Sequence, residues 1–146
     1  MGIDVQLNDL FTSLYTDIRD VEEKSIIKGE FSDITYNDMH VIDAIGVGDA
    51  KASSLVAKKL HVTMGTLTKA IDGLVSKGYV KRERSESDKR KVMLSLLDKG
   101  SRAYETHEQF HKKMVAAVLG QMDEHDASVL SKMLGGLQGY FREMAN

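Results

Sequence analysis

The sequence contains no cysteine, no proline and no tryptophan among its 146 residues. The lack of cysteine excludes disulfides and thiolate metal ligands, and it is consistent with a reducing compartment. Without proline, the helix ends must be set by capping side chains and by glycines. No apolar run approaches the ~20 residues of a transmembrane helix, and residues 1–10 lack the basic and apolar regions of a signal peptide. We therefore expect a cytoplasmic protein.

The charge of the chain is distributed unevenly. Residues 51–95 contain eleven Lys and Arg but only four Asp and Glu, a net charge of +7. The other residues contain nine basic and eighteen acidic side chains, which gives the whole chain a net charge of −2. A basic segment between acidic flanks is typical of a surface that binds phosphate groups. The apolar content of 42% indicates an ordinary globular protein rather than a disordered one.

Hydrophobic periodicity predicts helices over residues 5–28, 35–45, 53–60 and 63–77, and two further helices that start at Asp98 and near Asp123. Thr35 and Asp38 have the spacing of a capping box, and Thr63 is a predicted N-cap. In the helix over residues 53–60, we expect Leu55, Val56 and Leu60 to face the core.

After Gly78 the apolar period changes from helical to alternating, which predicts two strands. Val80, Arg82 and Arg84 form one face of the first strand, and residues 92, 94 and 96 form the inner face of the second. The polar residues 85–90 form an exposed loop between them. Two helices joined by a tight turn and followed by a hairpin are typical of a winged helix-turn-helix. We predict a mainly α fold with a small β-hairpin wing, and a DNA-binding module over residues 35–97.

The helix over residues 63–77 can enter the major groove, and the hairpin can reach the adjacent minor groove. Threonine side chains can contact phosphates and base edges, and Arg90 held by Asp88 suits a narrow minor groove. The alternatives are an ordinary solvated helix face, a solubilising hairpin, or a winged helix that binds only protein. No arrangement of catalytic residues points to an enzyme. The candidate DNA-binding residues are Ser53, Ser54, Thr63, Met64, Gly65, Thr66, Thr68, Lys69, Arg84, Asp88, Lys89, Arg90 and Lys91.

Two motifs in this region resemble the MarR family of bacterial transcription regulators. They are Leu60-His61-Val62-Thr63 leading to Gly78-Tyr79-Val80, and Asp88-x-Arg90-x-x-x-Leu94-x-Leu96-x-x-x-Gly100. The resemblance extends over residues 1–146 and implies a repressor that binds a pseudo-palindromic operator in double-stranded DNA. It also implies a homodimer that pairs through the helices in residues 1–34 and 98–146. His61 stands where a glycine is common in that family.

Further segments resemble the FabT-like fatty-acid-synthesis repressors within the MarR family. They are Ser32–Thr35, Met39-His40-x-Ile42-Asp43, Val62–Thr66 and Phe110-His111-Lys112-x-Met114-Val115. This resemblance implies control of fatty acid biosynthesis genes. It also implies a response to long-chain acyl groups carried by acyl carrier protein, with no metal or other cofactor.

A zinc-responsive repressor is the alternative. His107 and His111 are four residues apart, which places two imidazoles on one face of a helix, and His40 and Glu22 lie on helices that could approach them. Neutral imidazoles and a carboxylate can bind zinc without cysteine, and the MarR family includes zinc-uptake repressors with similarly placed His and Glu. The simpler interpretation is a set of surface or hydrogen-bonded histidines.

Overall fold

The computed structural model describes residues 2–146, which form two compact units divided between Phe110 and His111. The first unit contains the winged helix-turn-helix, the helix before it and the first half of the long helix after it, and the second unit contains the rest of that long helix and the last helix. The predicted division into a DNA-binding module (35–97) and flanking dimerisation helices concerns the roles of these segments and stays a prediction. The elements are α1 (Ile3–Ile26), a short 3-10 helix (Gly29–Phe31), α2 (Tyr36–Ile45), β1 (Lys51–Ala52), α3 (Ser53–Leu60), α4 (Met64–Ser76), β2 (Val80–Arg84), β3 (Val92–Leu96), α5 (Asp98–Leu119) and α6 (Glu124–Ala145).

The core of the first unit lies among α2, α3, α4 and one face of the sheet. Ile42 and Ile45 of α2 pack there with the apolar stripe of α4, and Leu94 contributes from β3. Each such fully buried side chain stabilises the fold by about 1.5–3 kcal/mol. The predicted helical stripes of α2 and α4 are confirmed, because Met39, Leu67, Ile71 and Leu74 are also buried.

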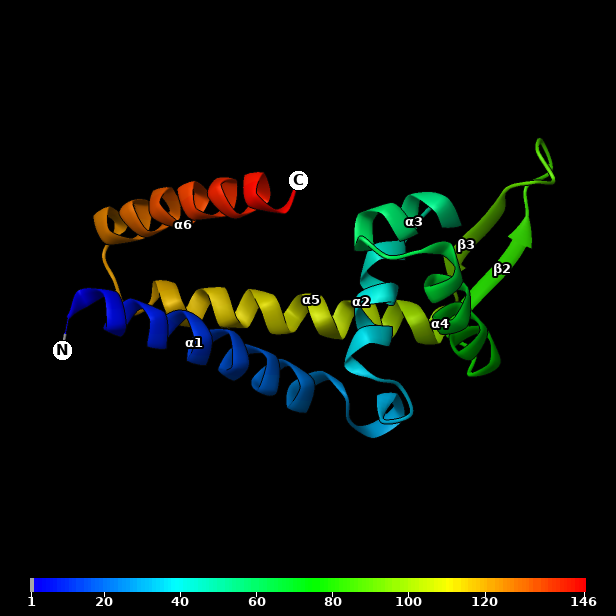
Figure 1. Ribbon diagram of the computed structural model, residues 1–146. Coiled ribbons are helices and arrows are strands. Elements are labelled where there is room, and N and C mark those ends of the chain that lie inside the picture. The colour runs from blue at the N-terminus through cyan, green and yellow to red at the C-terminus, as the bar shows by residue number, and fades with distance from the viewer. Residues whose placement is uncertain (1) are drawn as a thin grey trace. The chain divides into compact units, whose positions relative to one another are not determined.

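The sheet has three antiparallel strands in the order β1-β3-β2. The predicted hairpin is confirmed, with Val80 opposite Leu96 and Arg84 opposite Val92. The third strand, β1, was not predicted because two residues are too short to show an alternating pattern. In Figure 1 the hairpin extends away from α3 and α4 as a wing.

Local hydrogen bonds explain where the two central helices begin. The Asp38 N–H donates to Thr35 Oγ1 at 3.1 Å and the Thr35 N–H donates to Asp38 Oδ2 at 3.0 Å, which confirms the capping box. Between α3 and α4, His61 adopts a left-handed conformation with φ of 56°. That backbone region favours glycine, which explains why a glycine is common at this position in the family that the sequence resembles.

The prediction that Leu55 faces the core is wrong. Its side chain is 58% exposed, whereas Val56 and Ala57 are buried. Successive positions on an α-helix differ by about 100° in direction, so a core face centred between Val56 and Ala57 leaves Leu55 pointing outward. Leu60, at the end of α3, packs against the core as expected.

Large apolar side chains remain exposed in both units. In the first unit, α1 exposes Leu7, Leu10, Phe11 and Leu14 along one stripe. In the second unit, α6 is capped by Asp123, whose Oδ1 accepts from the Asp126 N–H at 2.8 Å, and none of its described residues is buried. Large exposed apolar stripes mark interaction surfaces. No described helix is both long and apolar enough to cross a membrane.

Candidate nucleic-acid interface

The first turns of α4 present a row of small polar side chains to solvent. Thr63 Oγ1 accepts from the Thr66 N–H at 3.2 Å and donates to Thr66 Oγ1 at 3.0 Å. Thr68 Oγ1 donates to the Met64 carbonyl at 2.8 Å. The Thr68 hydroxyl proton is therefore already used, so this oxygen can accept from a base amino group, and its methyl group can contact a thymine methyl.

The other predicted residues of this helix, Gly65 and Lys69, are also exposed. A Cβ placed on Gly65 would meet no heavy atom within 4 Å, so this part of the helix surface is open. Together with Thr63, Met64, Thr66 and Thr68, these residues form one continuous exposed face at the N-terminal end of α4. Such a face has the shape and the hydrogen-bonding groups that a major groove accommodates.

The tip of the wing is ordered by its own side chains. Both the backbone N–H and the Nε of Arg90 donate to Asp88 Oδ1, at 3.1 and 3.2 Å. These two hydrogen bonds, backbone first, lower the pKa of the Asp88 carboxyl. The Arg90 side chain remains 92% exposed. The predicted pairing of Asp88 with Arg90 is therefore present, and it leaves the rest of the guanidinium free to face a ligand.

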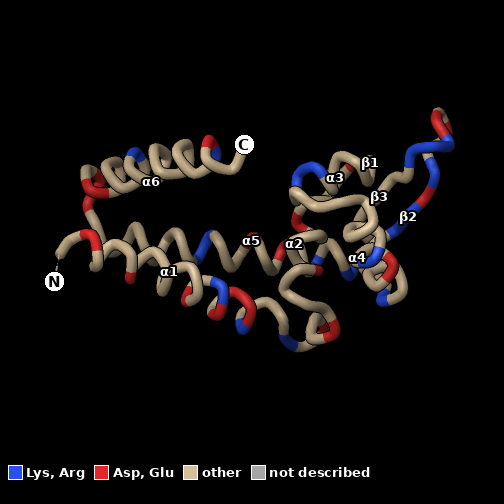
Figure 2. Tube along the Cα trace, in the orientation of Figure 1, with Lys and Arg blue, Asp and Glu red and all other residues tan. Residues whose placement is uncertain are grey.

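Further hydrogen bonds close the hairpin loop below this tip. Arg84 donates from a guanidinium N–H to the Lys89 carbonyl at 2.8 Å, and the Ser85 N–H donates to the Lys91 carbonyl at 2.9 Å. Figure 2 shows Lys and Arg concentrated along β2 and the following loop. Lys89, Arg90 and Lys91 are all exposed there. The loop therefore presents several cations from a defined backbone.

A hollow of about 400 Å³ separates α4 from the wing. Ser53, Thr68 and Arg84 line it from three different elements, while Ser54 is exposed at the start of α3. The structure thus places predicted residues of α3, α4 and the wing around one concave surface. Arg82 also lines this hollow and was missing from the predicted set, although its position two residues before Arg84 on one strand face could have indicated it.

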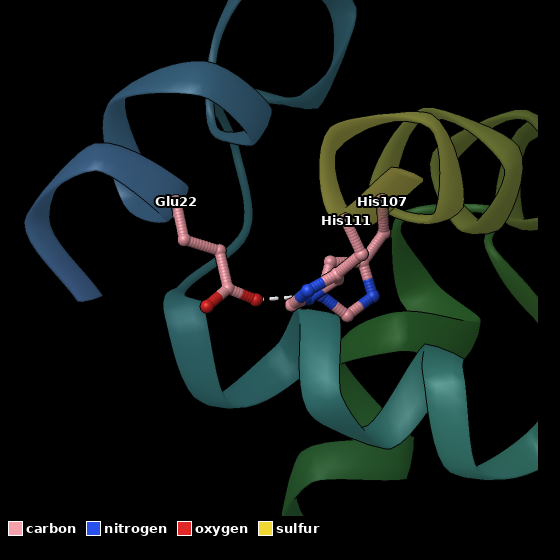
Figure 3. Close-up of side chains that lie close together, drawn as sticks. All are labelled: Glu22, His107 and His111. Carbon is pink, nitrogen blue, oxygen red and sulfur yellow. Dashed lines mark hydrogen bonds and ion pairs between the residues drawn. The ribbon is translucent and has the colours of Figure 1, made fainter. Parts of the chain in front are cut away.

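The histidine cluster forms a hydrogen-bonded network within the first unit. His107 is buried, with Nε2 2.6 Å from Glu22 Oε1 and Nδ1 3.2 Å from Asp43 Oδ1. Figure 3 shows the carboxylate of Glu22 directed at the His107 ring. Tyr36 donates to Glu22 Oε2 at 3.1 Å, and the His40 ring lies edge-on to His107 with 6.0 Å between centroids.

Electrostatics favour a charged imidazole at this position. Burial by itself lowers the pKa of His107, but the hydrogen bonds to Asp43 and Glu22 outweigh it, so the pKa is raised. The same contact with His107 lowers the pKa of Asp43. A metal requires a neutral imidazole with one free ring nitrogen, whereas both nitrogens of His107 face carboxylates. The contact of Asp43 with His107 was not predicted, because no sequence spacing relates two residues that lie 64 positions apart.

The proposed zinc ligands are therefore only partly assembled within the first unit. Glu22 and His107 are in contact, and the ring of His40 packs against His107. His111 follows His107 by one turn of the same helix, as the close-up in Figure 3 shows. The nitrogen and oxygen donors fit zinc chemistry, but zinc would have to displace the proton that His107 shares with its two carboxylates.

Three comparisons relate this chain to known proteins. Residues 22–106 match the family described as transcriptional regulator SarA/Rot. The regulator SarZ of Staphylococcus saprophyticus is 31% identical over 109 residues, covering 71% of this chain and 75% of that protein. The structure of Streptococcus pneumoniae FabT in complex with DNA has a TM-score of 0.89 and 36% identity, covering 95% of this chain and 97% of that one.

Other regulators are also similar to this chain in structure or in sequence. A MarR family transcription regulator superposes with a TM-score of 0.82 at 11% identity, covering 97% of this chain and 91% of that one, which shows the fold alone. The repressor YetL of Bacillus subtilis is 33% identical over 82 residues, or 56% of this chain. The chain spans about half the length of YetL and of PchR, another Bacillus subtilis regulator. Its fold and its sequence together show that the chain belongs to the SarA/Rot family of transcriptional regulators, which have a MarR-type winged helix.

Proposed function

We propose that this protein is a transcriptional regulator that binds double-stranded DNA, with α4 in the major groove and the wing in the adjacent minor groove. One observation carries the proposal: Thr68 of the exposed α4 face and Arg84 of the wing line the same concave surface. The net charge of +7 over residues 51–95 suits a phosphate backbone. DNA binding explains the residues of the α4 face and of the wing without any catalytic role.

The proposed regulator is a homodimer. The exposed apolar stripe of α1 supports this proposal, because a stripe of that kind is unfavourable in water unless a partner covers it. A two-fold symmetric dimer matches a pseudo-palindromic operator with half-sites about 34–36 Å apart.

The finer proposal is a repressor of fatty acid biosynthesis genes that responds to long-chain acyl groups on acyl carrier protein. It is supported by the 36% identity to Streptococcus pneumoniae FabT over nearly the whole chain. Such an effector can shift DNA binding only through a difference in its affinity for the DNA-bound and free conformations.

The proposal is tested by fluorescence anisotropy with DNA from upstream of the protein's own gene and of fatty acid synthesis genes. Binding is measured over a salt series, with and without acylated carrier protein. We expect affinity to fall steeply with salt, because each phosphate contact releases a counterion, and to change when the acylated carrier protein is added. Salt-sensitive binding without an acyl response would retain the regulator and reject the acyl effector. A lack of specific binding would reject the DNA-binding function.

Arg90→Ala is expected to weaken operator binding by roughly 5- to 150-fold, the equivalent of about 1–3 kcal/mol for one well-placed groove contact. The dimer should be unaffected, because Arg90 is exposed at the wing tip. The matched control is Lys24→Ala, which removes one positive charge from the exposed surface of α1. Equal effects of the two substitutions would mean that Arg90 contributes only net charge.

A zinc-responsive regulator that uses Glu22, His40, His107 and His111 is the second candidate. The contact between Glu22 and His107, with His111 one turn further along α5, favours it. Equilibrium dialysis with zinc, repeated on His111→Ala, tests this candidate. Submicromolar binding that His111→Ala abolishes would support it, and weak binding unaffected by the substitution would reject it.

A further inference from the structure

An acidic side chain lies on the face of α4 that we propose to meet DNA. Asp72 follows Thr68 by four residues and Lys69 by three, so it continues the same exposed face. A carboxylate there repels phosphate unless a cation neutralises it. Asp72 Oδ1 lies 2.5 Å from a guanidinium nitrogen of Arg82, which is on the second strand.

Stability does not explain this ion pair. The Asp72 and Arg82 side chains are 58% and 36% exposed, and exposed ion pairs contribute only about 0–1 kcal/mol. The pair does, however, join two elements that must act together on DNA. Arg82 lies on the strand that enters the wing, two residues before Arg84, and Arg84 holds the wing loop through the Lys89 carbonyl.

The geometry also leaves most of the Arg82 guanidinium available. Asp72 accepts from one of its terminal nitrogens, whereas a guanidinium has five N–H donors in a planar fork. The side chain borders the hollow between α4 and the wing. An arginine held at one nitrogen is preorganised, so it loses less conformational entropy when its other donors bind a phosphate oxygen.

We propose that Asp72 is a positioning residue for DNA binding: it holds Arg82 so that the guanidinium binds the DNA backbone between the recognition helix and the wing. This inference rests on the proposed DNA-binding function. Asp72 itself does not contact DNA, and it acts through Arg82. The pair also fixes the direction of the wing relative to α4.

Asp72→Asn distinguishes this proposal from a purely electrostatic effect, because the two predict opposite changes in the affinity for DNA. Removing a negative charge from the DNA-facing surface should tighten binding if charge alone matters. If Asp72 positions Arg82, the same substitution should weaken binding, by roughly tenfold for the loss of one charged hydrogen bond to phosphate. The matched control is Glu83→Gln, which removes an acidic side chain next to Arg82 on β2. This substitution should leave the DNA affinity unchanged or increase it.

Two further measurements identify the route through Arg82. Arg82→Ala should weaken binding and reduce the salt slope by about one phosphate contact. Asp72→Asn should then add no further loss in the Arg82→Ala background, because a residue that acts only through Arg82 is not additive with it. Arg82→Lys keeps the positive charge but loses the planar guanidinium, so this variant should bind DNA more weakly than the wild type.

The outcomes separate this inference from the proposed function. If the wild type does not bind DNA, both are overturned. If the wild type binds and Asp72→Asn binds equally or more tightly, or if the two substitutions are additive, only the positioning role of Asp72 is overturned. Thermal unfolding of Asp72→Asn should match that of the wild type, because the ion pair is exposed.

Discussion

His107→Ala is expected to lower the free energy of unfolding by about 3–5 kcal/mol, the usual cost of removing one partner from a buried ion pair. The substitution leaves the buried carboxylate of Glu22 facing a cavity, and the neutral Tyr36 hydroxyl that donates to it does not replace the lost positive charge. It also disconnects three helices, because His107 of α5 contacts α1 through Glu22 and α2 through Asp43. Urea denaturation at one fixed protein concentration measures the loss.

His125→Ala is the matched control for this experiment. His125 is exposed in the first turn of α6, and surface substitutions of this kind usually change stability by less than about 0.5 kcal/mol. If His107→Ala lowers the free energy of unfolding no more than His125→Ala does, the network among Glu22, Asp43 and His107 does not stabilise the fold.

The destabilisation caused by His107→Ala should depend on pH, and the direction of that dependence follows from the pKa shift of His107. The pKa of folded His107 is raised, so the stability that its charge contributes is complete below the unfolded value of about 6.5 and is lost as the pH rises through the folded pKa. The gap in unfolding free energy between wild type and His107→Ala should therefore be smaller at about pH 9 than at about pH 6. A gap that widens with pH would show that His107 is neutral in the folded protein.

Gly100→Ala is the second substitution for which we expect a large effect, a loss of about 3 kcal/mol. A Cβ at this position would overlap the carbonyl oxygen of Tyr79 and would lie 3.2 Å from Leu96 Cδ2. The carbonyl cannot move away freely, because it accepts the Leu97 N–H at 2.9 Å where the wing joins α5. The start of α5 would have to shift away from the strands that carry the wing.

Gly73→Ala is the control, since its Cβ would meet no heavy atom within 4 Å. Gly73 lies inside α4, where replacing glycine by alanine should stabilise the protein by up to about 1 kcal/mol. Chemical denaturation of the two variants should thus give opposite signs. A stabilised Gly100→Ala variant would show that the close approach of α5 to Tyr79 is not required.

The sequence determined the elements of the winged helix because local chemistry determines them. Helical and alternating periods separated α4 from the hairpin, and the Thr35 and Thr63 caps depend only on residues three positions away. The Asp88–Arg90 pair is equally local, since both of its hydrogen bonds lie within a single turn of the loop. Segments of this kind could be identified without knowledge of the fold.

Contacts between distant segments were decided only by the tertiary structure. Asp43 and His107 are 64 residues apart, and Asp72 reaches Arg82 only because the hairpin folds back beside α4. β1 is a strand only because β3 provides its hydrogen-bonding partner, and Leu55 is exposed because of how α3 lies on the core. A sequence pattern records which face of an element is apolar, whereas the side chains that meet across two elements depend on how those elements pack.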